Sequence, residues 1–264
     1  MISIDQGTYR EDIEITKDVH LIGSHEARLR SAKGASSESH IRCSVNKLVD
    51  VSIFDCDIYS KASTAGLVFG GLCSTTIVHC KISSQNFEGK TDSLVEKNDI
   101  YQNTASGVFI WEGANPTIRR NKLHHNKVAG CSFRNEGGGL IEKNDVFENK
   151  DVQILIRSKS DPIIKDNRIY KGGSLGISVY EQGKGRVLEN DIFQNAYSGI
   201  KIADGSTALI ENNKIHDNGE HGVWGVEGAH GVVLNNQIYN TNSKFKPIKI
   251  VENASTIVRD NIIK

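Results

Sequence analysis

The chain has 264 residues, and its 32 Lys and Arg side chains are balanced by 32 Asp and Glu side chains. A zero net charge gives no electrostatic signature of a protein that binds nucleic acid or anionic lipid, so neither is an expected partner. No run of about 18 apolar residues exists, and no basic region followed by an apolar run opens the chain, so neither a membrane-spanning helix nor a signal peptide is predicted.

The N-terminal segment contains two strand patterns, at residues 5–15 and 19–23, that are typical of the opening coil of a β-helix. Met1 precedes a strand almost at once, and Lys264 falls shortly after a repeat position. Neither end therefore has the polar cap that terminal repeats need. We expect the chain to be a fragment of something longer, and to be monomeric unless these uncapped ends associate.

Five cysteines are scattered through strand-like segments, at Cys43, Cys56, Cys73, Cys80 and Cys131. Their number is odd and no Cys-x-x-Cys pair is present, so reduced thiols in an intracellular compartment, the cytoplasm or the nucleus, are expected. Cys56 and Cys80 occupy equivalent positions of neighbouring repeats. This spacing permits a disulfide, but an inward stack of thiols is favoured.

One coil between these cysteines and the regular repeats is expected to be irregular. The spacing from Cys80 to Asn98 is 18 residues, five fewer than the repeat described next. Residues 85–90 are the expected site of the irregularity, with the loop after Gly89 cut down.

From residue 98 onward a 23-residue repeat dominates the sequence. Its marker is an Asn followed two residues later by Ile, Leu or Val. The marker occurs at Asn98, Asn121, Asn144, Asn167, Asn190, Asn213 and Asn236, and again at Asn261 after a two-residue delay. Nine residues after most markers a Gly precedes a short alternating strand, and Gln153 is the exception at that position.

A unit of this length, with two or three short strands and no helical stretch, cannot close its own core and must stack on copies of itself. The sequence therefore predicts an all-β fold, a right-handed parallel β-helix of the pectin-lyase-like solenoid type, with about 23 residues per coil and roughly eleven coils. One domain is expected over residues 1–264, with N-terminal coils at 1–60, irregular coils at 61–97 and regular repeats at 98–264.

The marker asparagines are expected to have a structural role, because side-chain amides in register can hydrogen-bond to their equivalents above and below. A second row of asparagines follows five residues after the first, at Asn103, Asn126, Asn149, Asn195 and Asn218. The residue after each marker alternates in sign, as in Asp99, Lys122 and Asp145, so stacked neighbours attract. This alternation accounts for the zero net charge without any partner.

The residue pattern of the repeats resembles that of a known family. Residues 115–126 (NPTIRRNKLHHN) and 138–149 (GGLIEKNDVFEN) alternate a Pro-led and a Gly-led coil. This pattern is similar to the parallel β-helix repeats (PbH1 or CASH type) of F-box-only substrate receptors of SCF ubiquitin ligases, over about residues 66–264. The resemblance implies a non-catalytic scaffold that recruits a protein substrate or adaptor. The family's F-box and its zinc-binding module have no counterpart in this sequence.

The outward face of the strand after each glycine is the predicted partner-binding face. It is predicted to carry Phe109, Trp111, Arg134, Leu155, Arg157, Tyr180, Lys201 and Trp224. Aromatic and arginine side chains are those that dominate binding interfaces, and they also suit stacking against sugars. The alternative for this face is a partly covered sheet on which long side chains pack along the strands.

A carbohydrate-binding or polysaccharide-processing β-helix is the alternative function. Hydrolysis needs a pair of carboxylates close together, and Glu181 and Asp204 stand one repeat apart in a row interrupted by Asn135 and Ser158. No further motif of such enzymes is present, so these two residues are only a weak catalytic candidate. No cofactor is expected.

No metal site is expected either. The nine histidines show no metal-ligand spacing. His124 and His125 are adjacent, so on a strand their side chains would point to opposite faces.

Overall fold

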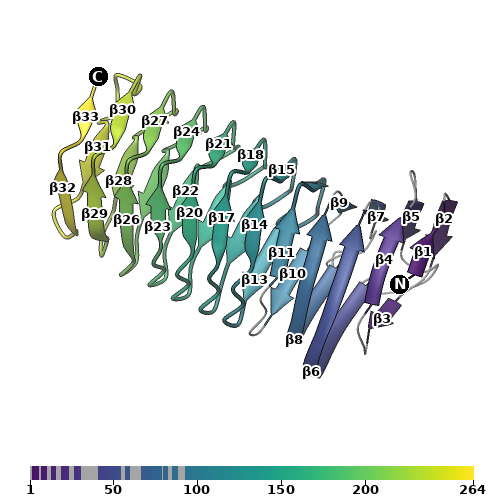
Figure 1. Cartoon of the computed structure of the whole chain (residues 1–264). Coiled ribbons are helices and arrows are strands. Elements are labelled where there is room, and N and C mark those ends of the chain that lie inside the picture. The colour runs from purple at the N-terminus through teal and green to yellow at the C-terminus, as the bar shows by residue number, and fades with distance from the viewer. Residues whose placement is uncertain are drawn as a thin grey trace.

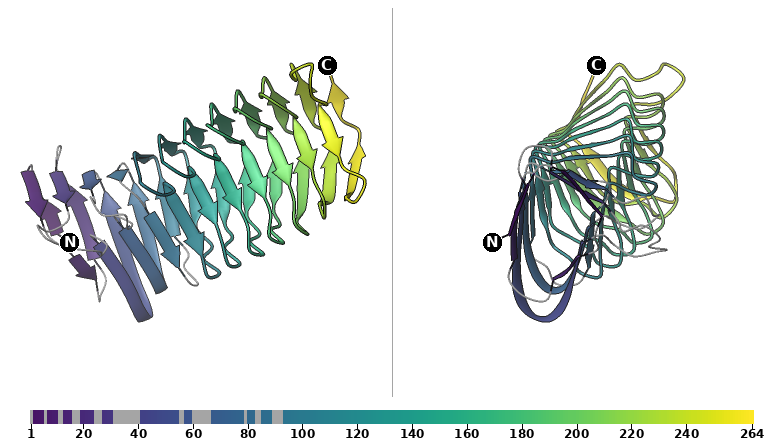
Figure 2. Two further views of the ribbon diagram at one scale, coloured as in Figure 1. Left: turned by 180° about the vertical axis from the view of Figure 1, so that it is seen from behind. Right: turned by 90° about the vertical axis from the view of Figure 1, so that its right-hand side faces the viewer.

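The chain forms a rod of stacked coils, each built from three short strands (Figure 1). The computed structural model describes residues 2–5, 7–10, 13–15, 19–23, 27–30, 41–54, 57–59, 67–78, 80–82, 85–88 and 93–264. Equivalent strands of successive coils pair in parallel, which gives three ladders that run the length of the rod (Figure 2). We call them the first, second and third ladder, in the order in which the chain visits them within a coil.

The regular coils begin at residue 93, and the strands of each ladder recur in register. The first ladder contains β11 (Ser93–Glu96), β14 (Thr117–Arg119), β17 (Leu140–Glu142), β20 (Ile163–Lys165), β23 (Arg186–Leu188), β26 (Thr207–Glu211), β29 (His230–Leu234) and β32 (Ser255–Arg259). The second contains β12 (Asp99–Tyr101), β15 (Lys122–His124), β18 (Asp145–Phe147), β21 (Arg168–Tyr170), β24 (Asp191–Phe193), β27 (Lys214–His216), β30 (Gln237–Tyr239) and β33 (Ile262–Ile263). The third contains β13 (Val108–Trp111), β16 (Cys131–Phe133), β19 (Ile154–Ile156), β22 (Ile177–Val179), β25 (Ile200–Ile202), β28 (Val223–Gly225) and β31 (Ile248–Ile250).

The N-terminal coils extend the same three ladders. They contain β1 (Ile2–Ile4), β2 (Gly7–Arg10), β3 (Ile13–Ile15), β4 (Val19–Gly23), β5 (Ala27–Arg30), β7 (Asp57–Tyr59), β9 (Lys81–Ile82) and β10 (Gln85–Glu88). Two long strands, β6 (Ile41–Phe54) and β8 (Leu67–Val78), each serve the third ladder with one end and the first ladder with the other. The second ladder has 12 strands, so the number of coils differs slightly from the eleven expected. The prediction of an all-β parallel solenoid is confirmed.

The irregular coil lies at a different place from the one predicted. Residues 85–88 form the ordinary strand β10, which pairs with β13 at the regular spacing of the third ladder. Ile82 pairs with Ile100, 18 residues on, whereas Gln85 pairs with Val108, 23 residues on. The five missing residues are therefore lost between Ile82 and Gln85, before β10 and not after it.

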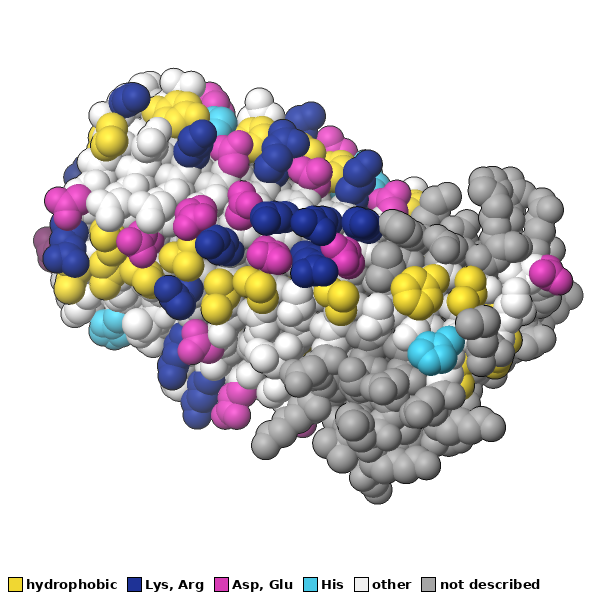
Figure 3. Space-filling model, in the orientation of Figure 1, with side chains coloured by type: hydrophobic (Ala, Val, Ile, Leu, Met, Phe, Trp, Pro, Cys, Tyr) yellow, Lys and Arg dark blue, Asp and Glu magenta, His cyan; other side chains and the backbone are white. Residues whose placement is uncertain are grey.

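The core is a set of aliphatic columns inside the rod. In the first ladder Val95, Ile118 and Ile141 have no exposed surface, and in the second ladder the same is true of Ile100 and Leu123. In the regular coils the three-residue strands of the first and second ladders have one buried side chain between two outward ones, whereas those of the third ladder from β16 to β28 have buried side chains at both ends. Because the register is constant, each buried position continues as a column from coil to coil. The outward side chains likewise form rows along the rod, one hydrophobic and one of mixed charge on the face shown in Figure 3.

The marker asparagines form a buried column between the first and second ladders. Each side-chain Nδ2 donates to the Oδ1 of the next Asn at 2.9–3.0 Å, from Asn98 through to Asn261. The same Oδ1 accepts the backbone N–H of the preceding Asn, as where Asn144 donates to Asn167 at 2.9 Å. Cys80 stands at the head of this column, since its backbone N–H donates to Asn98 Oδ1 at 2.8 Å. The predicted structural role of these residues is confirmed.

The second asparagine column is interrupted in one coil, and a residue of the preceding coil compensates for the missing side chain. Its regular position is occupied by Gly172 in one coil, where no side-chain amide is available. In the preceding coil Gln153 replaces the usual glycine, and its Oε1 accepts from Asn149 Nδ2 at 2.6 Å. A Cβ at Gly172 would overlap the Gln153 Nε2. Gln153 therefore supplies from one position the amide that is missing at the other.

The outward face of the second ladder carries two regular rows. The alternating charges pair in register, and Arg168 lies 3.3 Å from Asp145. Beside them runs a stack of aromatic and imidazole rings at centroid distances of 4.6–5.3 Å, all within 11° of parallel. The stacked residues are Tyr101, His124, Phe147, Tyr170, Phe193, His216 and Tyr239. The sequence signal was available, since each lies three residues after a marker asparagine, but the row was not predicted.

The described cysteine side chains lie inside the rod. The Cys80 thiol donates to the Ile53 carbonyl oxygen at 3.8 Å, and Cys131 has no exposed surface. Burial raises the pKa of the Cys131 thiol, so this thiol is unreactive. Cys56, and with it the predicted arrangement of Cys56 and Cys80, lies outside the described residues.

Within the described part of the chain, no helix has the length and apolar character needed to cross a membrane.

Candidate functional site

The predicted partner-binding face lies on the outward side of the third ladder. Phe109, Leu155, Lys201 and Trp224 lie in one row, because successive strands pair at these positions. The other predicted residues lie in the neighbouring row, which continues past the strand ends through backbone hydrogen bonds such as Arg157 N–H to Phe133 O at 3.1 Å. The structure thus brings all eight onto one face.

Most of these side chains are half-buried because they pack against one another. The Phe109 and Trp111 rings lie 6.0 Å apart, and Lys201 Nζ lies 4.7 Å from the Trp224 ring. Arg157 lies over the Tyr180 ring at 5.9 Å, and its Nη1 donates to the Tyr180 hydroxyl at 3.2 Å. Arg134 is the exposed member of the set. The face is therefore ordered, and it combines aromatic rings with cationic groups.

An open groove of about 830 Å³ lies beside this face, along the turns that connect the third ladder to the first. It is lined by Glu112, Gly113, Asn135, Glu136, Ser158, Lys159, Glu181, Gln182 and Asp204. These residues come from five successive coils, two from most turns. Carboxylate, amide, hydroxyl and ammonium groups therefore recur along the groove at the spacing of the coils, about 4.8 Å.

The groove turns share an unusual backbone conformation. In three successive turns two adjacent non-glycine residues have positive φ, as at Ser158 (52°) and Lys159 (63°), or Glu181 (52°) and Gln182 (59°). The turns at either end of this run have a glycine at the second position, Gly113 and Gly205. Left-handed backbone costs a residue with a side chain about 1–2 kcal/mol, whereas glycine avoids that strain. The middle turns thus keep side chains over the groove where glycine would be less strained.

Replacing one of these residues by glycine tests whether the side chains are retained at the expense of stability. We expect Lys159→Gly to raise the free energy of unfolding by up to about 1 kcal/mol, because relief of left-handed strain exceeds the entropy lost by glycine. Urea unfolding measures the change. Lys184→Gly, at an exposed residue that is not among the positive-φ positions, is the control and should be destabilising. A destabilised Lys159→Gly variant would contradict the strain argument.

Glu181 is held in the middle of the groove by contacts across two coils. Ser158 Oγ donates to Glu181 Oε2 at 2.8 Å, and Arg157 Nη1 lies 3.7 Å from Glu181 Oε1. Ser158 occupies the same repeat position as Glu181, one coil earlier. Ser158 interrupts the acidic row in the sequence, and in the structure it orients the carboxylate of the next coil. Asp204 follows Glu181 in the next coil and lines the same groove, so the structure brings the predicted carboxylate pair together.

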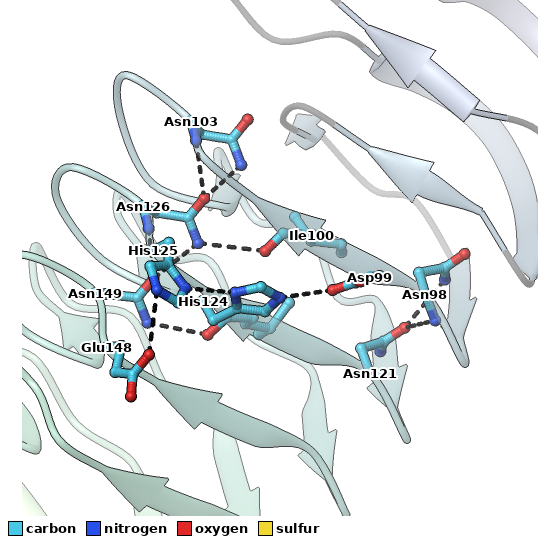
Figure 4. A network of polar contacts seen from close by, with 11 residues as sticks. Asn98, Asp99, Ile100, Asn103, Asn121, His124, His125, Asn126, Glu148 and Asn149 are labelled. Carbon is cyan, nitrogen blue, oxygen red and sulfur yellow. Dashed lines mark hydrogen bonds and ion pairs between the residues drawn. The ribbon is translucent and has the colours of Figure 1, made fainter. Parts of the chain in front are cut away.

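A second polar cluster lies at the corner that follows the second ladder (Figure 4). The prediction that His124 and His125 point to opposite faces is wrong: their Nδ1 atoms lie 2.7 Å apart. The reason is that the backbone of His125 is left-handed, with φ of 54°, so the chain turns at this residue instead of continuing the strand. No glycine marks this corner, so the turn could not be predicted from the sequence.

Two kinds of comparison with known proteins agree with the fold. A family model described as "right handed beta helix region" matches residues 65–208 and 170–264. The Azotobacter vinelandii mannuronan C-5 epimerase AlgE6 A-module is similar with a TM-score of 0.75 and 14% identity, covering 99% of this chain and 90% of that one. Periplasmic alginate epimerase AlgG is similar with a TM-score of 0.72 and 14% identity, covering 97% of this chain and 76% of that one.

Pectate lyase Pel9A has the same architecture, with a TM-score of 0.60 and 13% identity over 99% of this chain and 80% of that one. At such identities the likeness shows the fold alone. No curated protein matches the chain in sequence. The right-handed parallel β-helix predicted from the repeat is thereby confirmed.

These findings correct the predicted function. A protein-recruiting scaffold of the F-box receptor type was expected, but neither the family model nor the similar structures link the chain to such receptors. Structures that share its fold include epimerases and a lyase named for alginate, mannuronan and pectate. The main functional prediction was wrong, and its carbohydrate alternative is the better supported of the two.

Proposed function

The chain belongs to the right-handed β-helix family, and from this premise we propose that it binds a polysaccharide along the groove beside the third ladder. The observation that carries the proposal is the groove itself, which presents polar side chains from five successive coils next to a face of aromatic rings and arginines. A polysaccharide is an extended chain of repeating polar units, and it therefore fits an elongated groove with polar side chains at regular intervals.

The side chains that line the face supply the contacts that sugars need. Aromatic rings such as Trp111 and Tyr180 offer apolar surfaces, while carboxylates and amides in the adjacent turns offer hydrogen bonds. Arg134 is exposed and Arg157 lies in the next coil, so a guanidinium can meet an anionic or hydroxyl group at each step. Together these contacts support an elongated ligand that lies across the coils.

Glu181 and Asp204 are the residues we propose for chemistry on the bound glycan. They follow one another at the spacing of one coil, and two carboxylates roughly 5 to 9.5 Å apart can act as acid and base in glycoside cleavage. Ser158 and Arg157 hold Glu181 in place. Ordered positioning of this kind is what a reacting group requires.

A glycan array with neutral and acidic polysaccharides tests the binding proposal. We expect the wild-type chain to bind at least one polysaccharide, and Arg134→Glu with Arg157→Glu to weaken that binding by more than about tenfold, since both guanidinium groups would be replaced by shorter side chains of opposite charge. Lys127→Glu with Lys150→Glu is the matched control. It makes the same change of charge on exposed side chains one coil apart, away from the groove, and should leave binding unchanged.

Turnover of the bound glycan is measured separately, by the release of reducing or unsaturated ends and by NMR for epimerisation. Glu181→Gln with Asp204→Asn should abolish turnover while binding is retained. A wild-type chain that binds no polysaccharide on the array would overturn the proposal, and binding that survives both arginine substitutions would place the site elsewhere.

A further inference from the structure

The corner after β15 contains four polar side chains joined in one line (Figure 4). Asp99 Oδ1 lies 2.7 Å from His124 Nε2, and the Nδ1 atoms of His124 and His125 lie 2.7 Å apart. His125 Nε2 in turn lies 3.1 Å from Glu148 Oε2. The four residues come from three successive coils, and none of them lines the groove beside the third ladder.

The carboxylates decide where the imidazole hydrogens lie. A carboxylate accepts a hydrogen bond and cannot donate one when ionised, so Asp99 and Glu148 each favour the form of their histidine that carries hydrogen on Nε2. Both Nδ1 atoms then present lone pairs toward each other at 2.7 Å. Two lone pairs at this distance repel unless both nitrogens bind one cation, either a shared proton or a metal ion that lies to the side of the line joining them.

From this arrangement we infer that His124 and His125 bind a divalent transition-metal ion through their Nδ1 atoms. A histidine whose other ring nitrogen donates to a carboxylate is the usual form of a metal-binding histidine, because the carboxylate fixes the ring and makes it a better ligand. Asp99 and Glu148 provide that support for both rings. They would act as positioning residues and not as ligands.

The distance between the two nitrogens indicates which metal fits best. With metal–nitrogen bonds of about 2.0–2.1 Å, two ligands at a right angle lie about 2.9 Å apart, and two at the tetrahedral angle about 3.3 Å apart. The observed 2.7 Å is nearer the right angle, which is the geometry of square-planar Cu²⁺. Among the described residues no group of three metal-binding side chains comes together, so solvent would complete the coordination. The His125 side chain is 52% exposed and leaves room for it.

The same rod contains a natural control four coils further on. His216 lies in the same ring stack and its Nε2 contacts Asp191 at 3.0 Å, as His124 contacts Asp99. There the neighbouring residue is Asp217, whose Oδ2 lies 2.6 Å from His216 Nδ1. This corner accommodates an aspartate where the first has His125, so His125→Asp is a substitution that the fold tolerates.

Titration of tag-free protein with Cu²⁺, followed by calorimetry and by electron paramagnetic resonance, tests the inference. We expect the wild-type chain to bind one equivalent more than His125→Asp, with a signal of nitrogen coordination that the variant lacks. Asp99→Asn and Glu148→Gln should each weaken this binding by about 10- to 100-fold without removing it. Equal stoichiometry in the wild-type chain and in His125→Asp would overturn the inference.

A gain of binding provides the complementary test. Asp217→His with Asn240→Glu places all four side chains at the second corner, because Asn240 stands where Glu148 does. We expect this variant to bind one more equivalent of Cu²⁺ than the wild-type chain. If it binds no more, these four side chains do not suffice to form the site, and the inference fails.

Discussion

Asn167→Leu is expected to lower the free energy of unfolding by about 3–5 kcal/mol. Asn167 Oδ1 accepts both the backbone N–H and the Nδ2 of Asn144, at 2.9 and 3.0 Å. Leucine has a similar size but no acceptor, so two buried donors would lose their partners, and each such loss costs about 1–3 kcal/mol. Chemical denaturation followed by circular dichroism measures the change.

The control for this substitution is the same change at the end of the column. Asn261 accepts from Asn236 in the same way, at 3.0 Å, but it is only partly buried. Water can replace its side chain there, so Asn261→Leu should cost about 1 kcal/mol. Equal costs at both sites would show that burial of the column does not set its contribution.

The second large effect is expected from exchanging the compensating pair in the second asparagine column. Gly172→Asn alone places a side chain against Gln153 Nε2, and Gln153→Gly alone leaves Asn149 Nδ2 with one of its two acceptors, the Leu123 carbonyl oxygen. Each single substitution should cost about 2–3 kcal/mol, through overlap in one and an unpaired donor with a void in the other. The double variant should recover most of the loss, because it rebuilds the regular Gly and Asn positions.

A double-mutant cycle measures this coupling from the unfolding of the four proteins. The two single losses add to about 4–6 kcal/mol and the double variant should lose only about 1 kcal/mol, so we expect a favourable coupling energy of about 3–5 kcal/mol, at or above the upper end for residues in contact. Additive losses, with the double variant the least stable of the four, would contradict the view that Gln153 substitutes for the missing asparagine.

The fold could be predicted because its evidence is periodic. The position of each marker asparagine from Asn98 to Asn236 follows from its neighbours at 23 residues, and a buried polar side chain at such spacing has few alternatives to a hydrogen-bonded column. The same argument placed Trp111 and Arg157 on one face and Glu181 beside Asp204. Where the 23-residue spacing is broken, the repeat does not predict which turn has changed in length. The five residues missing between Ile82 and Gln85 could have been lost from any turn of that coil.

The conformation of the corners could not be read from the sequence. Positive φ at His125, Lys159 and Gln182 belongs to residues that seldom adopt it, and no glycine marks these positions. The contact between His124 and His125 and the shape of the groove both depend on those corners. The prediction of a protein-recruiting scaffold was wrong for a different reason. The residue pattern of the repeats is determined by the stacking of coils, which proteins of many functions share.

The alternating charges of the second ladder limit how such a rod can change in length. Asp145 lies against Arg168, and Arg168 against Asp191, so like charges recur only every second coil. Removal of a single coil between them would set Asp145 against Asp191, whereas removal of two would keep opposite signs in contact. Duplication or loss during evolution should therefore proceed by pairs of coils, 46 residues at a time.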